Sequence, residues 1–119
     1  MIVPAPPETP SVKSAVTISL VPEAARGPFV FDCSTAEGLS LAAACQRAAD
    51  LGFDAIEIFP SDAENFPREE VGELLAQHSL ALAAVGTGAG WLRHGLSLSA
   101  ADPVTRARAI DFVRGMIEV

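Results

Sequence analysis

Three short apolar runs alternate along this chain with three segments in which apolar residues recur at helical spacing. The apolar runs cover residues 15–20, 55–59 and 80–85, and the periodic segments cover residues 41–51, 67–78 and 102–119. This alternation predicts an α/β fold with a parallel sheet, because parallel strands need a helical crossover between them. Such sheets form either open doubly wound layers or closed (β/α)8 barrels.

The ends of the predicted helices carry recognisable signals. Ser40 is expected to cap the first helix, Pro67 to take the first helical position of the second, and Asp102 to cap the third. Residues 21–38, with several prolines and glycines, are expected to form one long loop. Its apolar Phe29 and Phe31 could cover a substrate or pack on the first helix.

The two faces of the predicted strands favour the barrel. One face is apolar throughout and is expected to meet the helices; it carries Val16, Ile18, Leu20, Ile56 and Ile58. The opposite face carries Ser19 and Glu57, and an open sheet with helices on both faces would bury that carboxylate at a cost. We therefore expect Ser19 and Glu57 to point into a barrel.

A complete barrel of this kind needs roughly 250 residues, whereas the chain has 119. The expected fold is an incomplete parallel (βα)3 segment of a TIM-like (β/α)8 barrel, formed by residues 15–119. Residues 1–14, with four prolines, are expected to be a poorly ordered lead-in. The first and third strands would lack partners on their outer sides, so a homo-oligomer could form through these edges.

The composition of the chain argues against some classes of binding partner. The net charge of −7 disfavours nucleic acid, which is bound by clustered Lys and Arg. No apolar run is long enough to span a membrane, and residues 1–14 do not resemble a secretory signal. Cys33 and Cys45 form no metal-binding motif, and Cys45 is expected to be a buried thiol. We therefore expect a cytoplasmic protein with no membrane partner.

Four stretches of the chain resemble a known family. They read AVTISLVPEA, AADLGFDAIEIFP, LLAQHSLALAAVGTG and LSLSAADPVTRARAIDFVRGMIEV, and together they extend over most of residues 16–119. These stretches resemble the N-terminal part of the sugar phosphate isomerase/epimerase family, the xylose isomerase-like barrels. The resemblance implies a TIM-like barrel that isomerises or epimerises a sugar by removing a proton next to a carbonyl.

The resemblance also implies a divalent metal ion for a complete family member, held by carboxylates and histidines of later strands. No metal ligand or catalytic residue is therefore expected within this chain. The related AP endonucleases place a metal-binding histidine after the third strand. Here that position reads Gly86-Thr87-Gly88, without a histidine, which argues against an endonuclease.

The expected substrate-binding residues are Ser19, Glu57, Thr87, Trp91 and His94. Glu57 could bind a sugar hydroxyl or form an internal ion pair, and Ser19 could bind the same ligand or simply fill space. Residues 86–95 form a glycine-rich loop, where backbone N–H groups could approach a substrate. A dinucleotide is disfavoured, because Trp91 replaces the last glycine of GxGxxG and no helix is expected to open there.

Trp91 and His94 keep two interpretations each. Trp91 could stack on a sugar or cover the barrel mouth, and His94 could act on a hydroxyl or be an ordinary surface residue.

The function expected from the sequence is the substrate-binding rim of a sugar phosphate isomerase/epimerase-like enzyme, without the metal site. Its ligand would be a small sugar or sugar phosphate, and the chain alone is expected to be inactive. The alternative is a non-enzymatic α/β module that self-associates through open strand edges. A weaker alternative is an open nucleotide-binding domain that uses the GTGAG loop.

Overall fold

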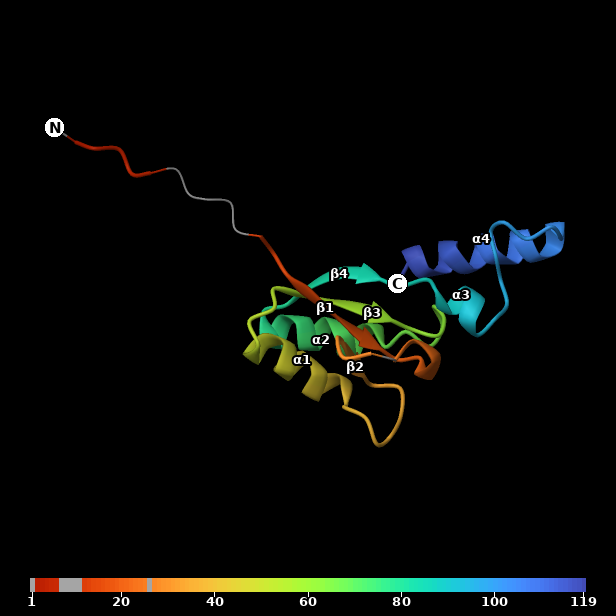
Figure 1. The fold of residues 1–119 in the computed structure, drawn as a ribbon, viewed down its shortest axis with the longest axis horizontal. Helices are drawn as coiled ribbons and strands as arrows, with labels where there is room; N and C mark the ends of the chain where they lie inside the picture. Colours follow the sequence, from red (N-terminus) through yellow and green to blue (C-terminus); the bar gives the residue numbers. More distant parts are fainter. Residues whose placement is uncertain (1, 7–11, 26) are drawn as a thin grey trace.

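A computed structural model describes residues 2–6, 12–25 and 27–119 of the chain. Its strands form an all-parallel sheet in the order β2-β1-β3-β4 (Figure 1). The strands are β1 (Ala15–Ser19), β2 (Val30–Asp32), β3 (Ala55–Phe59) and β4 (Ala81–Val85). The helices are η1 (Pro22–Ala24), α1 (Leu41–Asp50), α2 (Arg68–His78), α3 (Ala89–Leu92) and α4 (Pro103–Ile117). The predicted α/β class with a parallel sheet is confirmed.

The helices begin and end close to where the sequence signals place them. The Ser40 hydroxyl accepts a hydrogen bond from the Ala43 N–H at 3.0 Å, and the Asp102 carboxylate accepts from the Thr105 N–H at 3.0 Å. Both predicted caps are therefore confirmed. Pro67 lies one position before the helix, as the N-cap of α2, so its predicted place at the first helical position was wrong.

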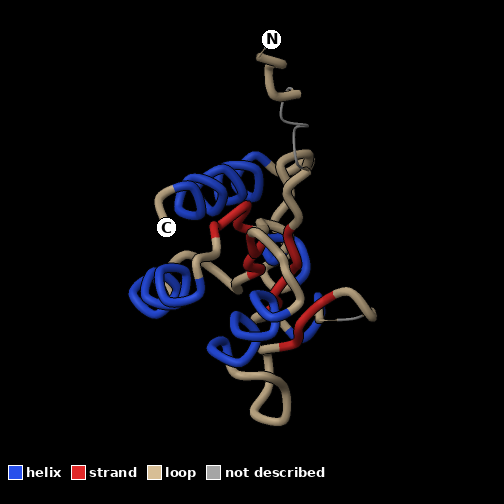
Figure 2. The backbone as a smooth tube through the Cα atoms, turned by 90° about the vertical axis from the view of Figure 1, so that its left-hand side faces the viewer, coloured by secondary structure: helices blue, strands red, loops and turns tan. Residues whose placement is uncertain are grey.

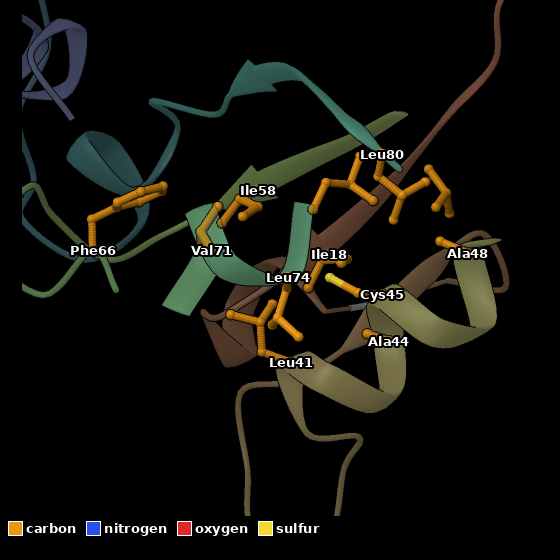
Figure 3. Close-up of a cluster of buried hydrophobic side chains, with 12 residues drawn as sticks. Ile18, Leu41, Ala44, Cys45, Ala48, Ile58, Phe66, Val71, Leu74 and Leu80 are labelled. Carbon is orange, nitrogen blue, oxygen red and sulfur yellow. The ribbon is translucent and has the colours of Figure 1, made fainter. Parts of the chain in front are cut away.

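One face of the sheet packs against α1 and α2 and forms the hydrophobic core (Figure 3). The strand residues of this core are Val16, Ile18, Ile56 and Ile58. The helices contribute Leu41, Ala44, Cys45 and Ala48 from α1, and Val71 and Leu74 from α2. Leu20 packs against the same cluster. The predicted apolar strand face is thus confirmed, because in-register parallel strands present alternate residues to the same side.

The stretch predicted as one long loop contains a strand. β2 pairs in parallel with β1, with Phe31 beside Ile18 and Asp32 beside Ser19. The expectation that the first strand would lack an outer partner was therefore wrong, and the described sheet has four strands rather than three. Phe31 packs on the core beside Ile18, whereas Phe29, just before β2, is 84% exposed.

The glycine-rich segment also differs from the prediction. The short helix α3 begins at Ala89 inside it, whereas no helix was expected to open directly after the GTGAG loop. The Gly90 N–H donates to the Thr87 carbonyl at 3.1 Å, and the next N–H groups continue the turn.

The longer helices lie on different sides of the strands. Figure 1 shows α1 and α2 together beneath the sheet, while α4 lies apart from them toward the C-terminal ends of the strands. Figure 2 shows these three helices above, to the left of and below the strands. In the described part of the chain, none of the helices is both long and apolar enough to cross a membrane.

The predicted lead-in, residues 1–14, lies partly outside the described residues, because residues 1 and 7–11 are not described. Residues 2–6 and 12–14 form neither helix nor strand.

Candidate functional site

The sheet face opposite α1 and α2 carries the candidate site. Thr17 of β1, Glu57 of β3 and Ala84 of β4 stand in register across three neighbouring strands. Side chains in one such row project from the same face. Glu57 is partly exposed, and its two neighbours in the row have smaller side chains. The sequence placed Glu57 on this face correctly.

Glu57 is not committed to a partner within the described residues. Within the described residues, the Glu57 carboxylate takes part in no hydrogen bond and in no ion pair. Its carboxylate therefore remains free, among these residues, to accept hydrogen bonds from a ligand.

Ser19 lies on the same face, but its hydroxyl is hydrogen-bonded to the backbone. Its side chain is fully buried, and its hydroxyl donates to the Val21 carbonyl at 2.9 Å. The same oxygen accepts from the Val21 N–H at 3.2 Å. The hydroxyl thus stabilises the tight turn that follows β1, and both of its hydrogen-bonding roles are taken.

A second carboxylate on this face was missed by the sequence reasoning. Asp32 ends β2 in register with Ser19, so it projects from the Glu57 face of the sheet. Its Oδ1 accepts from the Ser34 hydroxyl and from the Ser34 N–H at 2.9 Å. These two bonds lower the pKa of the Asp32 carboxyl, since both favour its charged form. The three residues of β2 are too few for a periodic pattern, so the sequence carried no local signal for this residue.

The loop after β3 brings a further group to the C-terminal ends of the strands. Asp62 accepts from the N–H and the side-chain amide of Asn65, at 2.8 Å each, and from the Ser61 hydroxyl. Burial alone would raise its pKa, but these hydrogen bonds and the nearby His94 outweigh burial and lower it. The loop therefore holds an ionised carboxylate, and the sequence reasoning missed this residue as well.

His94 joins the two loops that follow β3 and β4. Its Nε2 lies 2.9 Å from the Ser61 carbonyl oxygen, and its ring centre lies 5.5 Å from that of Phe112 in α4. The carbonyl requires Nε2 to donate, which leaves Nδ1 for other contacts. His94 is thus a tethered loop residue beside Asp62.

The glycines after β4 have a packing role. A Cβ atom at Gly86 or Gly88 would lie 2.5 or 2.7 Å from the Phe59 ring, and one at Gly90 would lie 3.0 Å from the Phe112 ring. These positions need glycine because aromatic rings lie against the backbone. The expectation that the glycines serve the approach of a substrate is not needed to explain them.

Thr87 and Trp91 line a different hollow, of about 170 Å³, between α3 and α4. Its floor is apolar and includes Leu96, Ala109 and Phe112. Trp91 is 67% exposed, so much of its indole ring faces solvent. Among the predicted residues, the structure therefore pairs Thr87 with Trp91 and His94 with the Asp62 loop, and it leaves Glu57 on the sheet face.

The metal ion implied by the resemblance does not fit the described side chains. Within residues 2–6, 12–25 and 27–119, no three His, Cys, Asp or Glu side chains are grouped so that they could hold a metal ion. None of the described residues is therefore assigned to a metal ion.

The fold and the site define an α/β protein with an all-parallel sheet and polar side chains on one sheet face and in the following loops. In such proteins, ligands bind at the C-terminal ends of the strands. The chain matches none of the family models with which it was compared. A search of curated proteins found no match either.

Proposed function

We propose that this chain forms the substrate-binding rim of a (β/α)8 barrel that acts on a small sugar or sugar phosphate, as in the sugar phosphate isomerase/epimerase family. The observation that carries the proposal is the row of Thr17, Glu57 and Ala84 on the face opposite the helices. A carboxylate between small side chains leaves room for a ligand and accepts hydrogen bonds from hydroxyl groups.

The helices support a barrel. β1, β3 and β4 are neighbours in chain order, and the helices α1 and α2 pack together on one face. A barrel likewise has its helices outside and polar groups reaching the interior near the C-terminal strand ends. β2 lies on the other side of β1, an order that open doubly wound sheets also have, so the proposal rests on the helices and the polar face and not on the strand order. Asp32 and Glu57 lie on the face that would become the interior.

The loops after β3 and β4 support a polar ligand at the same end. The tethered His94, whose Nε2 donates to the Ser61 carbonyl, leaves Nδ1 as an acceptor, and the ionised Asp62 adds negative charge beside it. A sugar presents hydroxyl groups that can donate to such an acceptor. The rim would bind and orient the ligand, and no step of the reaction is assigned to these residues.

A binding experiment tests this proposal. The ¹⁵N-labelled chain would be titrated with D-xylose and with D-fructose 6-phosphate while backbone amide shifts are followed by NMR. We expect shifts around Glu57 and in residues 59–62, and at least a tenfold weaker affinity for Glu57→Gln. Glu73→Gln, which removes the same charge from an exposed position of α2, is the matched control and should bind normally.

Two results would count against the proposal. One is the absence of any saturable shift with either sugar. The other is equal loss of affinity in Glu57→Gln and Glu73→Gln, which would point to overall charge rather than to a site.

A further inference from the structure

The described sheet has two edges that can accept a further strand. β4 pairs with β3, and no second neighbour of β4 lies within the described residues. The Ala81 N–H donates to the Asp54 carbonyl, just before β3, at 3.0 Å. N–H groups of a regular strand alternate in direction, so we infer that the Leu82 N–H, next to Ala81 and ahead of the register shift between Leu82 and Ala84, points outward. Leu82 itself is 37% exposed.

The opposite edge is short and has an apolar hollow beside it. β2 covers only the last three residues of β1, from Thr17 to Ser19. Beside the uncovered start of β1 lies a hollow of about 530 Å³, whose lining includes Ala15, Val16, Phe29 and Leu51. Phe29 and Leu51 are 84% and 65% exposed. Exposed apolar surface next to an open strand edge is typical of an interaction site.

We propose that a second copy of this chain occupies both edges. In this dimer β4 of each copy pairs in parallel with the β2 edge of the other, around a two-fold axis that runs along the strands. The apolar side chains of the incoming strand then cover the hollow beside β1. The two sheets close into one barrel.

Three features of the chain favour a second copy over another partner. Both edges belong to one all-parallel sheet, so an axis along the strands preserves the parallel direction at both junctions. Two sheets of four strands give eight, which is the strand number of the closed parallel barrel. The helices α1 and α2 already cover one face, so closure leaves them outside.

The site proposed above becomes enclosed only in this dimer. Glu57 of each copy then faces a shared interior, where ligand contacts are shielded from water. The net charge of −7 on each copy opposes association, so salt should strengthen the dimer by screening. The dimer depends on the strand edges and not on sugar binding, so the two proposals can fail separately.

The mass of the 119-residue chain in solution tests the inference. Sedimentation velocity over a range of concentrations should show a reversible dimer with twice the mass of the chain, and a larger dimer fraction at high salt. A chain that stays monomeric throughout would overturn the proposal. Assemblies that grow beyond the dimer would also overturn it, because they would show open head-to-tail pairing.

Two variants locate the interface at β4. Ala83→Lys places a charge on the exposed strand and should shift the chain to monomer, while Ala76→Lys, the same change on the exposed side of α2, should not. Leu82→Pro removes the outward N–H and should act in the same direction, with circular dichroism to confirm folding. Equal dissociation by both lysine variants would overturn the assignment. A dimer that binds no sugar would support this inference and remove only the sugar site.

Discussion

The ring of Phe59 lies against the backbone of Gly86, and a Cβ atom at residue 86 would come to 2.5 Å from its Cδ2. Phe59 ends β3, and residue 86 directly follows β4. The contact therefore holds the C-terminal ends of β3 and β4 together, at the end of the sheet that carries the candidate site. Gly88 repeats the relationship at 2.7 Å from Cζ of the same ring.

We expect Gly86→Ala to destabilise the protein by about 1–3 kcal/mol, because the new methyl group overlaps the body of the ring and forces a shift. Urea unfolding followed by circular dichroism measures this change. Gly72→Ala is the matched control, since a Cβ atom there meets nothing within 4 Å. That change in the α2 helix should stabilise by roughly 0.5–1 kcal/mol. Equal behaviour of the two variants would contradict the packing role.

Ser19→Ala should lower the free energy of unfolding, so its effect should not be confined to ligand binding. The substitution leaves the N–H of the buried Val21 without its side-chain acceptor, at a cost of about 1–3 kcal/mol. The urea midpoint measures this loss, and Thr17→Val on the same strand serves as a control of similar size. A Ser19→Ala chain with normal stability and weakened sugar binding would reverse the interpretation in favour of a ligand contact.

Asp102 should make the start of α4 sensitive to acid. Hydrogen bonds from the Thr105 hydroxyl at 2.7 Å and from two N–H groups lower the pKa of its carboxyl. The folded chain therefore binds this proton less tightly than the unfolded chain. The stabilisation is present above the ordinary pKa of 3.8 and is lost as pH falls through the lowered value.

Melting temperatures of the wild type and of Asp102→Ala check this expectation. The difference between them should be largest near neutral pH and should shrink below pH about 4. Asp102→Asn keeps an acceptor without the charge, so it should melt above Asp102→Ala and respond less to acid. A difference that is constant with pH would show that the carboxylate does not supply the cap.

Cys33 should react slowly with alkylating reagents. Burial, followed by the charge of Asp32, raises the pKa of its thiol from 9.0 to about 11. Since the thiolate is the reactive form, the iodoacetamide rate of a Cys45→Ala chain should rise with a midpoint near pH 11. A midpoint near pH 9 would contradict the burial of this thiol in the folded chain.

The same shift has a consequence for stability. The folded chain holds the Cys33 proton more tightly than the unfolded chain, so its contribution is complete below pH about 9. It is then lost progressively as pH rises from about 9 toward about 11. Cys33→Ala should abolish this part of the alkaline destabilisation, as measured by urea midpoints between pH 8 and about 11.

Local patterns were enough to predict most of the elements. The alternation in Val16, Ile18, Ile56 and Ile58 placed the core face correctly, because a strand turns alternate side chains to one side whatever its neighbours are. Ser40 and Asp102 were equally readable, since a cap is made within one turn of its own helix. Glu57 could be assigned to the opposite face for the same reason.

The sequence missed what depends on partners distant in the chain. β2 has three residues, too few for a periodic signal, and it exists because β1 offers it an open edge. The glycines of residues 86–90 resembled a ligand-binding loop, yet their need arises from distant rings: Phe59, which lies 27 positions before Gly86, for Gly86 and Gly88, and Phe112 for Gly90. Asp62 and His94 meet only because parallel strands bring their loops to the same end.

By itself the sequence determined the α/β class, the helix caps and the two strand faces, since these follow from spacing and from hydrogen bonds between near neighbours. Only the tertiary structure decided three features: the additional strand β2, the hydrogen bonding of the Ser19 hydroxyl to Val21, and the packing of aromatic rings on the glycine backbone. Each of these depends on which segments the parallel sheet brings side by side. That choice is set by the packing of the whole sheet and not by any local pattern.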